Sequence, residues 1–152
     1  MEYIQAAKEN GEDDRGCVFC ELPEGDPERV LATSALAYVV LNKFPYNPGH
    51  LLIVPVRHAA DVEDLTDDEQ LELQRMLQRS LRALRSVSDP HGFNVGMNLG
   101  AIAGAGIPGH LHWHLVPRWS GDTNFMPVVG QTRVLPELLA ETARKLAPGF
   151  ER

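Results

Sequence analysis

A chain of 152 residues, of which 43% are hydrophobic, is long enough to bury a core, and we expect a single domain. The formal net charge of −7 argues against binding to a nucleic acid backbone, although local cations such as Lys43, Arg57 and Arg118 can still hold a small anionic ligand. The chain has no apolar run of about 18 residues and no signal-peptide pattern, so we expect a cytoplasmic protein without a membrane span.

The N-terminal segment is polar and acidic, and we expect residues 1–16 to form an arm ahead of one domain over residues 17–152. The domain begins with the only two cysteines of the chain, Cys17 and Cys20. In a reducing compartment, a lone pair at this spacing is typical of a metal half-site or a redox motif. The spacing alone leaves both possibilities open.

Two strand-like runs follow, Ala37–Asn42 and His50–Val56. The pair Pro48-Gly49 between them suits a type II turn, because the second central position of that turn requires a positive φ. This segment is therefore predicted to be a β-hairpin.

A capping box predicts where the main helix begins. The hydroxyl of Thr66 can accept from the N–H of Glu69, whose carboxylate can in turn accept from the N–H of Thr66. We expect the helix to end before Asp89-Pro90. Its apolar positions keep near-helical spacing, and they are Leu71, Leu73, Met76, Leu77, Leu81 and Leu84.

Two further elements complete the pattern. Residues Phe93–Leu99 alternate as a strand does, and Pro136 near the start of Leu135–Leu146 marks a short C-terminal helix. Strand pairs with short turns and helices that do not alternate with them indicate an α+β protein around an antiparallel sheet.

Three of the six histidines, His110, His112 and His114, alternate with Leu111, Trp113 and Leu115. In a strand this alternation places all three imidazoles on one face. Three such histidines can bind zinc as in an open catalytic site, or one imidazole can act as a nucleophile that its neighbour orients. They can also be ordinary hydrogen-bonded residues of the core or surface, and the spacing alone does not decide.

The loop before the histidines, Gly104-Ala-Gly-Ile-Pro-Gly109, formally matches a dinucleotide-binding fingerprint. We reject that interpretation, because the fingerprint needs a helix after the loop and here a strand is predicted. The glycines still allow backbone N–H groups to approach an anion closely. A tight structural loop is the simpler alternative.

The run His110-Leu-His-Trp-His-Leu-Val116 resembles the motif of the histidine triad family. Residues 42–55 are similar to the nucleotide-facing strand pair of that family, and Asn98-Leu-Gly100 with Pro117-Arg-Trp119 resembles the bacterial diadenosine tetraphosphate phosphorylases. The resemblance covers nearly the whole chain. It implies a histidine-triad fold with about five antiparallel strands, one long helix and a short C-terminal helix, and a homodimer.

The resemblance also implies roles for the three histidines, which are the candidate catalytic residues. His112 would attack the α-phosphate of a dinucleoside polyphosphate or nucleoside phosphate derivative and form a nucleotidyl-histidine, which water or phosphate resolves. His114 would stabilise the charge on the phosphate oxygens, and His50 would orient catalytic groups from behind.

The nucleotide contacts follow from the same resemblance. Asn98 and the N–H groups of Gly104 to Gly106 would hold phosphate oxygens, and Asn42 would bind the ribose of a purine nucleotide. The base pocket would be lined by Phe19, Leu22 and Val40, for which an ordinary core position is an equal alternative.

The resemblance also implies a structural zinc ion, because some relatives share a pattern of cysteines and histidines with this chain. Some bacterial triad proteins and the galactose-1-phosphate uridylyltransferases carry two cysteines and a later histidine that match Cys17, Cys20 and His58. Their fourth ligand is the first triad histidine, here His110, which completes a closed tetrahedral set. A vacated site or a redox dithiol are the alternatives.

One difference from the family pattern favours a function other than catalysis. Many members carry a serine or threonine in the loop before the triad, where this chain has Gly106 and Ile107. A nucleotide-binding or sensing module with little turnover is therefore the alternative to an enzyme. Transfer to a sugar phosphate is a third possibility, but the uridylyltransferases have a glutamine at the position of His114.

Overall fold

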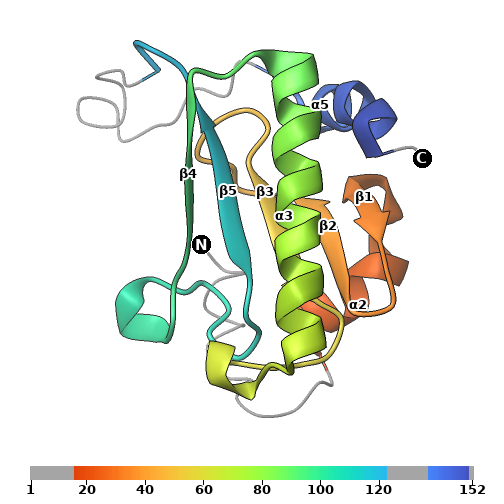
Figure 1. The fold of residues 1–152 in the computed structure, drawn as a ribbon, viewed down its shortest axis with the longest axis vertical. Coiled ribbons are helices and arrows are strands. Elements are labelled where there is room, and N and C mark those ends of the chain that lie inside the picture. The colour runs from red at the N-terminus through yellow and green to blue at the C-terminus, as the bar shows by residue number, and fades with distance from the viewer. Residues whose placement is uncertain (1–15, 123–136, 151–152) are drawn as a thin grey trace.

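The computed structural model describes residues 16–122 and 137–150, which Figure 1 shows as one sheet with helices on both faces. Apart from Gly16, the predicted N-terminal arm lies outside the described residues. The α+β class predicted from the sequence is confirmed. Within the described residues, no helix is both long and apolar enough to cross a membrane.

The sheet is antiparallel throughout, with the strand order β1-β2-β3-β5-β4. The predicted hairpin is present, since β2 pairs with β3 from Ala37 opposite Pro55 to Leu41 opposite Leu51. Gly49 has a φ of 78° in the turn, and a Cβ there would lie 3.0 Å from Leu84, so this turn requires glycine. The strands are β1 (Val30–Thr33), β2 (Ala37–Leu41), β3 (Leu51–Pro55), β4 (Gly92–Met97) and β5 (Trp113–Arg118).

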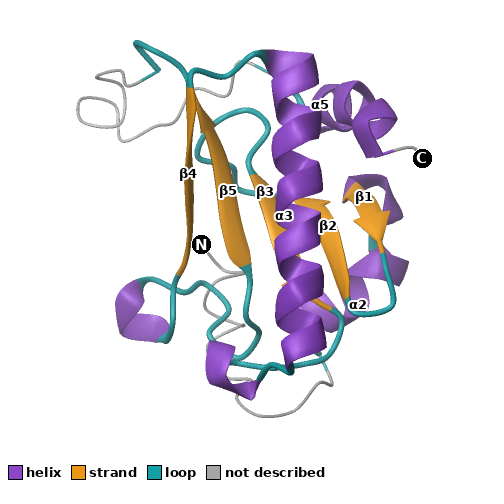
Figure 2. Cartoon of the chain, in the orientation of Figure 1, coloured by secondary structure: helices purple, strands orange, loops and turns teal. Residues whose placement is uncertain are grey.

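Helix α3 (Asp67–Ser88) crosses one face of the sheet, as Figure 2 shows. Thr66 caps it through the predicted capping box with Glu69, and the helix ends at Asp89 with a φ of 42°. The predicted apolar stripe is wrong at Leu71, which is 49% exposed, because its position faces away from the sheet. The stripe is otherwise confirmed, with Leu81 partly buried and the rest buried, namely Leu73, Met76, Leu77 and Leu84.

Arg57 connects the loop after β3 to the first turn of α3. Its guanidinium donates to both carboxylate oxygens of Glu69 at 2.8 and 2.7 Å, and to the carbonyl of Asp64 at 2.7 Å. The Glu69 carboxylate also accepts from the N–H of Thr66 at 2.8 Å. Glu69 is only 4% exposed, so this ion pair stabilises the helix start more than a solvent-exposed pair would.

Replacing Glu69 with glutamine should lower the free energy of unfolding by about 2 kcal/mol at pH 7, because the charge-assisted hydrogen bonds from Arg57 are lost while the capping box with Thr66 can still form. The bonds from Arg57, and then those from Thr66, hold the pKa of Glu69 at about 2. Since this value lies below the unfolded value of about 4.3, the stabilisation is fully present above pH 4.3 and is lost as the pH falls toward 2. Urea unfolding across this range should show the difference between wild type and variant shrinking.

A matched control is Glu72→Gln in the same helix, where the pair with Arg75 is longer, at 3.6 Å, and the side chains of Arg75 and Glu72 are 67% and 20% exposed. This variant should change the unfolding free energy by less than about 0.5 kcal/mol. Equal effects of the two variants would contradict the account of Arg57 and Glu69.

The elements before the hairpin were not predicted. Helix α2 (Val18–Gly25) lies on the face of the sheet opposite α3, where Tyr38 donates to the carbonyl of Phe19 at 2.7 Å. Pro23 inside this short helix weakens any helical pattern in the sequence. The last helix, α5 (Leu139–Leu146), starts four residues after the predicted Leu135 and continues into a 3-10 turn, and Pro136 lies outside the described residues.

Only the second half of the predicted histidine strand is a strand in the structure. β5 begins at Trp113, so His114 lies within the sheet, while His110 and His112 lie in the non-strand segment before it. The N–H of Leu111 donates to the carbonyl of Ala59 at 2.7 Å, in the loop after β3, instead of to a strand neighbour. This contact directs the segment away from the sheet ladder and toward the loop that carries His58.

Candidate active site and metal centre

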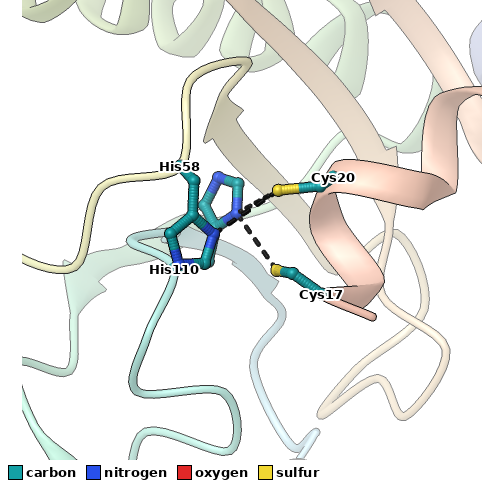
Figure 3. Close-up of side chains that lie close together, drawn as sticks. All are labelled: Cys17, Cys20, His58 and His110. Carbon is teal, nitrogen blue, oxygen red and sulfur yellow. Dashed lines mark hydrogen bonds between the residues drawn. The ribbon is translucent and has the colours of Figure 1, made fainter. Parts of the chain in front are cut away.

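Two cysteines and two histidines, whose side chains could hold a metal ion, meet where α2, the β3–α3 loop and the segment before β5 converge, as Figure 3 shows. The Nδ1 of His110 lies 3.4 Å from the sulfur of Cys17 and 3.5 Å from that of Cys20. The Nδ1 of His58 lies 3.4 Å from the sulfur of Cys20. All four ligand atoms lie within 4.8 Å of one another.

The donor set fits a zinc ion. Zinc–sulfur and zinc–nitrogen bonds of about 2.3 and 2.0 Å give ligand atoms roughly 3.3 to 3.8 Å apart in a tetrahedron, close to the separations here. The Nε2 of His110 lies 2.9 Å from the carbonyl of Pro55, to which it can only donate. The hydrogen therefore sits on Nε2, which leaves the Nδ1 lone pair toward the sulfurs, as a metal ligand requires. These are the four residues that the sequence identified.

His112 lies two residues beyond His110 and is 6% exposed. Its Nδ1 lies 2.8 Å from the carbonyl oxygen of His110, which accepts a hydrogen bond and so places the ring hydrogen on Nδ1. The Nε2 atom then carries a lone pair. Burial lowers the pKa of His112, so the ring is neutral at pH 7 and this lone pair is available.

A chain of hydrogen bonds sets the state of His114. The N–H of Tyr46 donates to the Nδ1 of His50 at 3.0 Å, so the hydrogen of His50 sits on its Nε2. That Nε2 donates to the Nδ1 of His114 at 2.9 Å, which leaves His114 with its hydrogen on Nε2. Burial lowers the pKa of His114 to about 4, so this ring is a neutral hydrogen-bond donor at pH 7.

His112 and His114 are therefore opposite tautomers, with the ring hydrogen on Nδ1 in His112 and on Nε2 in His114. The rings of His112 and His114 meet edge to face with centroids 5.0 Å apart. His112 presents an unprotonated Nε2 and His114 an Nε2–H group, so a nitrogen lone pair and a hydrogen-bond donor lie side by side. The sequence predicted a position behind the triad for His50, and the structure places it there, fully buried.

A pocket of about 230 Å³ lies beside both rings. It contains six of the seven residues predicted to bind the nucleotide, and they are Phe19, Leu22, Val40, Asn42, Gly104 and Gly106. The Nδ2 of Asn42 lies 3.3 Å from the Nδ1 of His50, close to the histidine chain. The pocket thus has an apolar wall from α2 and β2 and polar groups near the imidazoles.

Asn98 is the predicted residue that the structure places elsewhere. It does not line the small pocket, but its Nδ2 lies 3.8 Å from where a Cβ on Gly104 would be, and it lines a larger cavity that His114 also lines. Sequence reasoning missed Arg29 and Tyr46, which do line the pocket. Tyr46 carried a signal, since it lies in the turn between the two hairpin strands, but its stacking on His114 joins distant parts of the chain.

The chain is similar to known proteins in both sequence and structure. The HIT domain model matches residues 24–121. The chain is 49% identical over 136 residues to a Mycobacterium tuberculosis protein named AP-4-A phosphorylase, and the match covers 88% of this chain and 70% of that protein. It is 32% identical over 103 residues to adenosine 5'-monophosphoramidase hnt1 of Schizosaccharomyces pombe, and covers 67% of this chain and 74% of that protein.

A crystal structure of a zinc-bound histidine triad family protein from Mycobacterium smegmatis shares the fold. The TM-score is 0.74 at 26% identity, and the match covers 91% of this chain and 95% of the other. The matched model spans more than half of the chain, including His110, His112 and His114. The chain therefore belongs to the histidine triad (HIT) family.

Proposed function

We propose that this protein is a nucleotidyl hydrolase or transferase that cleaves a dinucleoside polyphosphate, such as diadenosine tetraphosphate, through a nucleotidyl-histidine intermediate. The two named relatives process nucleotides, by their names, which supports a nucleotide-processing enzyme of the HIT family. The observation that carries the proposal is the buried His112, whose ring hydrogen is held by the carbonyl of His110 while its other nitrogen is unprotonated.

In the first step, the Nε2 of His112 attacks one α-phosphorus, and a P–N bond forms as the P–O bond to the rest of the substrate breaks. The electron pair of that bond leaves with the departing nucleotide. The positive charge on the imidazole is stabilised by the hydrogen bond from Nδ1 to the carbonyl of His110. The Nε2–H of His114 donates to the phosphate oxygens, where negative charge develops.

In the second step, water or inorganic phosphate attacks the same phosphorus, and the P–N bond breaks with its electron pair returning to Nε2, so His112 is neutral again. An attacking water releases its proton to solvent. Throughout, the base would lie against Phe19 and Leu22, and the ribose near Asn42. The backbone of the loop at Gly104 to Gly106 would hold phosphate oxygens.

We further propose that Cys17, Cys20, His58 and His110 hold a structural zinc ion. A zinc ion with four protein ligands has no open position for substrate, so it would supply stability and not chemistry. The site holds His110, whose carbonyl is the hydrogen-bond partner of His112. The metal ligands thus fix the residue that orients the proposed nucleophile.

We also propose a homodimer. β4 is an edge strand of the sheet in the part of the chain that the structure describes, and Val95 on it is 43% exposed. An exposed edge is suited to pairing with another copy of itself.

Product analysis tests the proposed reaction. With diadenosine tetraphosphate in water, hydrolysis should give AMP and ATP, whereas added inorganic phosphate should divert the products to ADP and ATP if phosphate resolves the intermediate. Separation of the nucleotides by ion-exchange chromatography measures this. Tight nucleotide binding without turnover of any such substrate would contradict the proposal and favour a binding module.

A further inference from the structure

A second and larger cavity, of about 1130 Å³, adjoins the nucleotide pocket. Tyr46 and His114 line both cavities, so the two meet at the ring that we place against the reacting phosphate. We call the larger cavity the β4–β5 groove, after the strands that provide much of its lining. Its lining includes Gly96, Asn98, Val116, Arg118 and Trp119.

The groove extends along β5 away from His114. Val116 and Arg118 follow His114 at alternate positions, so they share its face of the strand, and Trp119 lies just beyond the end of β5. At about 3.3 Å per residue, Trp119 lies roughly 16 Å along the strand from His114. This distance is comparable to the length of an extended nucleoside triphosphate.

Gly96 keeps the groove open at the end nearest the reaction. It pairs with His114 in the sheet register, and a Cβ built on Gly96 would meet no atom within 4 Å. A departing phosphate chain could therefore pass directly from His114 over this glycine. A larger residue at this position would fill the same space.

The far end of the groove suits a nucleoside. The Nε1–H of Trp119 donates to the carbonyl of Ser88 at 3.1 Å, which fixes the indole ring beside the groove. An indole face is a stacking surface for a nucleobase. Asn98 lies at the other end of the groove, just after Met97, which pairs with Trp113, and there its amide can bind phosphate oxygens. Trp119 belongs to the Pro117-Arg118-Trp119 run, which the proposed chemistry at the triad does not use.

The charges in the groove do not repel an anionic ligand. Its lining includes two carboxylates, Asp122 and Glu137. Asp122 accepts from Arg118 at 2.6 and 2.7 Å, and Glu137 is paired with Lys145. Each carboxylate is thus neutralised by a neighbouring cation.

We propose that the β4–β5 groove binds the departing nucleotide of a dinucleoside polyphosphate. The inference rests on the proposed function, because it assumes that the reacting phosphate lies at His112 and His114. The small pocket cannot hold the whole substrate, since its 230 Å³ lies below the roughly 300–1,000 Å³ typical of ligand pockets. One nucleotide would occupy that pocket, and the second would extend past His114 into the groove.

The test compares two ligands and two glycine variants by isothermal titration calorimetry. The ligands are AMP, which occupies only the small pocket, and a diadenosine tetraphosphate analogue whose phosphates are joined by methylene bridges and are not cleaved. The variants are Gly96→Leu, which fills the groove beside His114, and the control Gly92→Leu on the same strand. A Cβ at Gly92 also meets no atom within 4 Å, and Gly92 does not line the groove.

The wild type and Gly92→Leu should bind the analogue at least tenfold more tightly than AMP. Gly96→Leu should lose this tenfold advantage while its Kd for AMP changes by less than twofold. Trp119→Ala should weaken analogue binding, and Trp119→Phe should restore most of it. This pair of variants tests the groove independently if Gly96→Leu perturbs the strand.

Equal Kd values of the wild type for the two ligands, or an undiminished advantage in both Gly96→Leu and Trp119→Ala, would overturn the inference. A Gly96→Leu variant that loses AMP and analogue binding in parallel would overturn it too. Because these are binding measurements, absence of turnover would contradict the proposed function without deciding the role of the groove.

Discussion

Replacement of His112 with alanine should lower kcat/KM for diadenosine tetraphosphate by about 10⁴-fold, because a nucleophile that acts through a covalent intermediate has no substitute in the site. The loss should appear in kcat, since the apolar wall of the pocket remains to bind the nucleotide. Steady-state kinetics with and without inorganic phosphate measures it.

The matched control is His114→Ala, which removes a donor and not the attacking atom. Loss of one such donor typically costs roughly 10²- to 10³-fold in kcat, so this variant should retain more activity than His112→Ala. Thermal unfolding of both variants separates a loss of fold from a loss of chemistry. An unchanged rate in a folded His112→Ala protein would contradict the assignment of the nucleophile.

Removal of zinc should lower the thermal stability of the protein strongly. A ligand present at 1,000 times its Kd stabilises the folded state by about 4 kcal/mol. For a domain of this size, each kcal/mol shifts the Tm by roughly 2–4 °C, so a chelator should lower the Tm by about 8–16 °C. Protein purified without a chelator should contain close to one zinc ion per chain by elemental analysis.

The control for this experiment is the double variant Cys17→Ser and Cys20→Ser, which lacks both sulfur ligands. Its Tm should be low and should not change when a chelator is added. A zinc content near zero in freshly purified wild-type protein, with a Tm that does not respond to the chelator, would contradict the proposed metal centre.

The elements predicted correctly are those whose signals are local. The capping box at Thr66 and Glu69 determines where α3 begins, because both hydrogen bonds of the box lie within one turn. The hairpin of β2 and β3 was likewise predictable from two apolar runs and a short turn. Leu71 shows the limit of the helical pattern, since a leucine at a near-periodic position still points to solvent.

The parts that failed depend on tertiary contacts. The alternation predicts His112 within a strand, but the N–H of Leu111 donates to the carbonyl of Ala59 in a distant loop, and the strand starts only at Trp113. Helix α2 contains Pro23, and its position depends on packing against the far face of the sheet. Alternation in the sequence cannot reveal either effect.

The identity of the candidate site residues could be predicted from the motif, whereas the tautomers of the histidines could be assigned only from the structure. The four proposed metal ligands were identified by resemblance, and the structure brings their ligand atoms within 4.8 Å. The opposite tautomers of His112 and His114 depend on which backbone groups face each ring, namely the carbonyl of His110 and the N–H of Tyr46. No spacing of histidines in a sequence contains that information.

The most direct test of the central claim is the mass of the intact protein after rapid mixing with diadenosine tetraphosphate and quenching. The account predicts a species heavier by one AMP moiety, with the modification on His112 after proteolysis, and no such species in His112→Ala. Turnover by the wild type without any adduct, or an adduct that persists in His112→Ala, would contradict it.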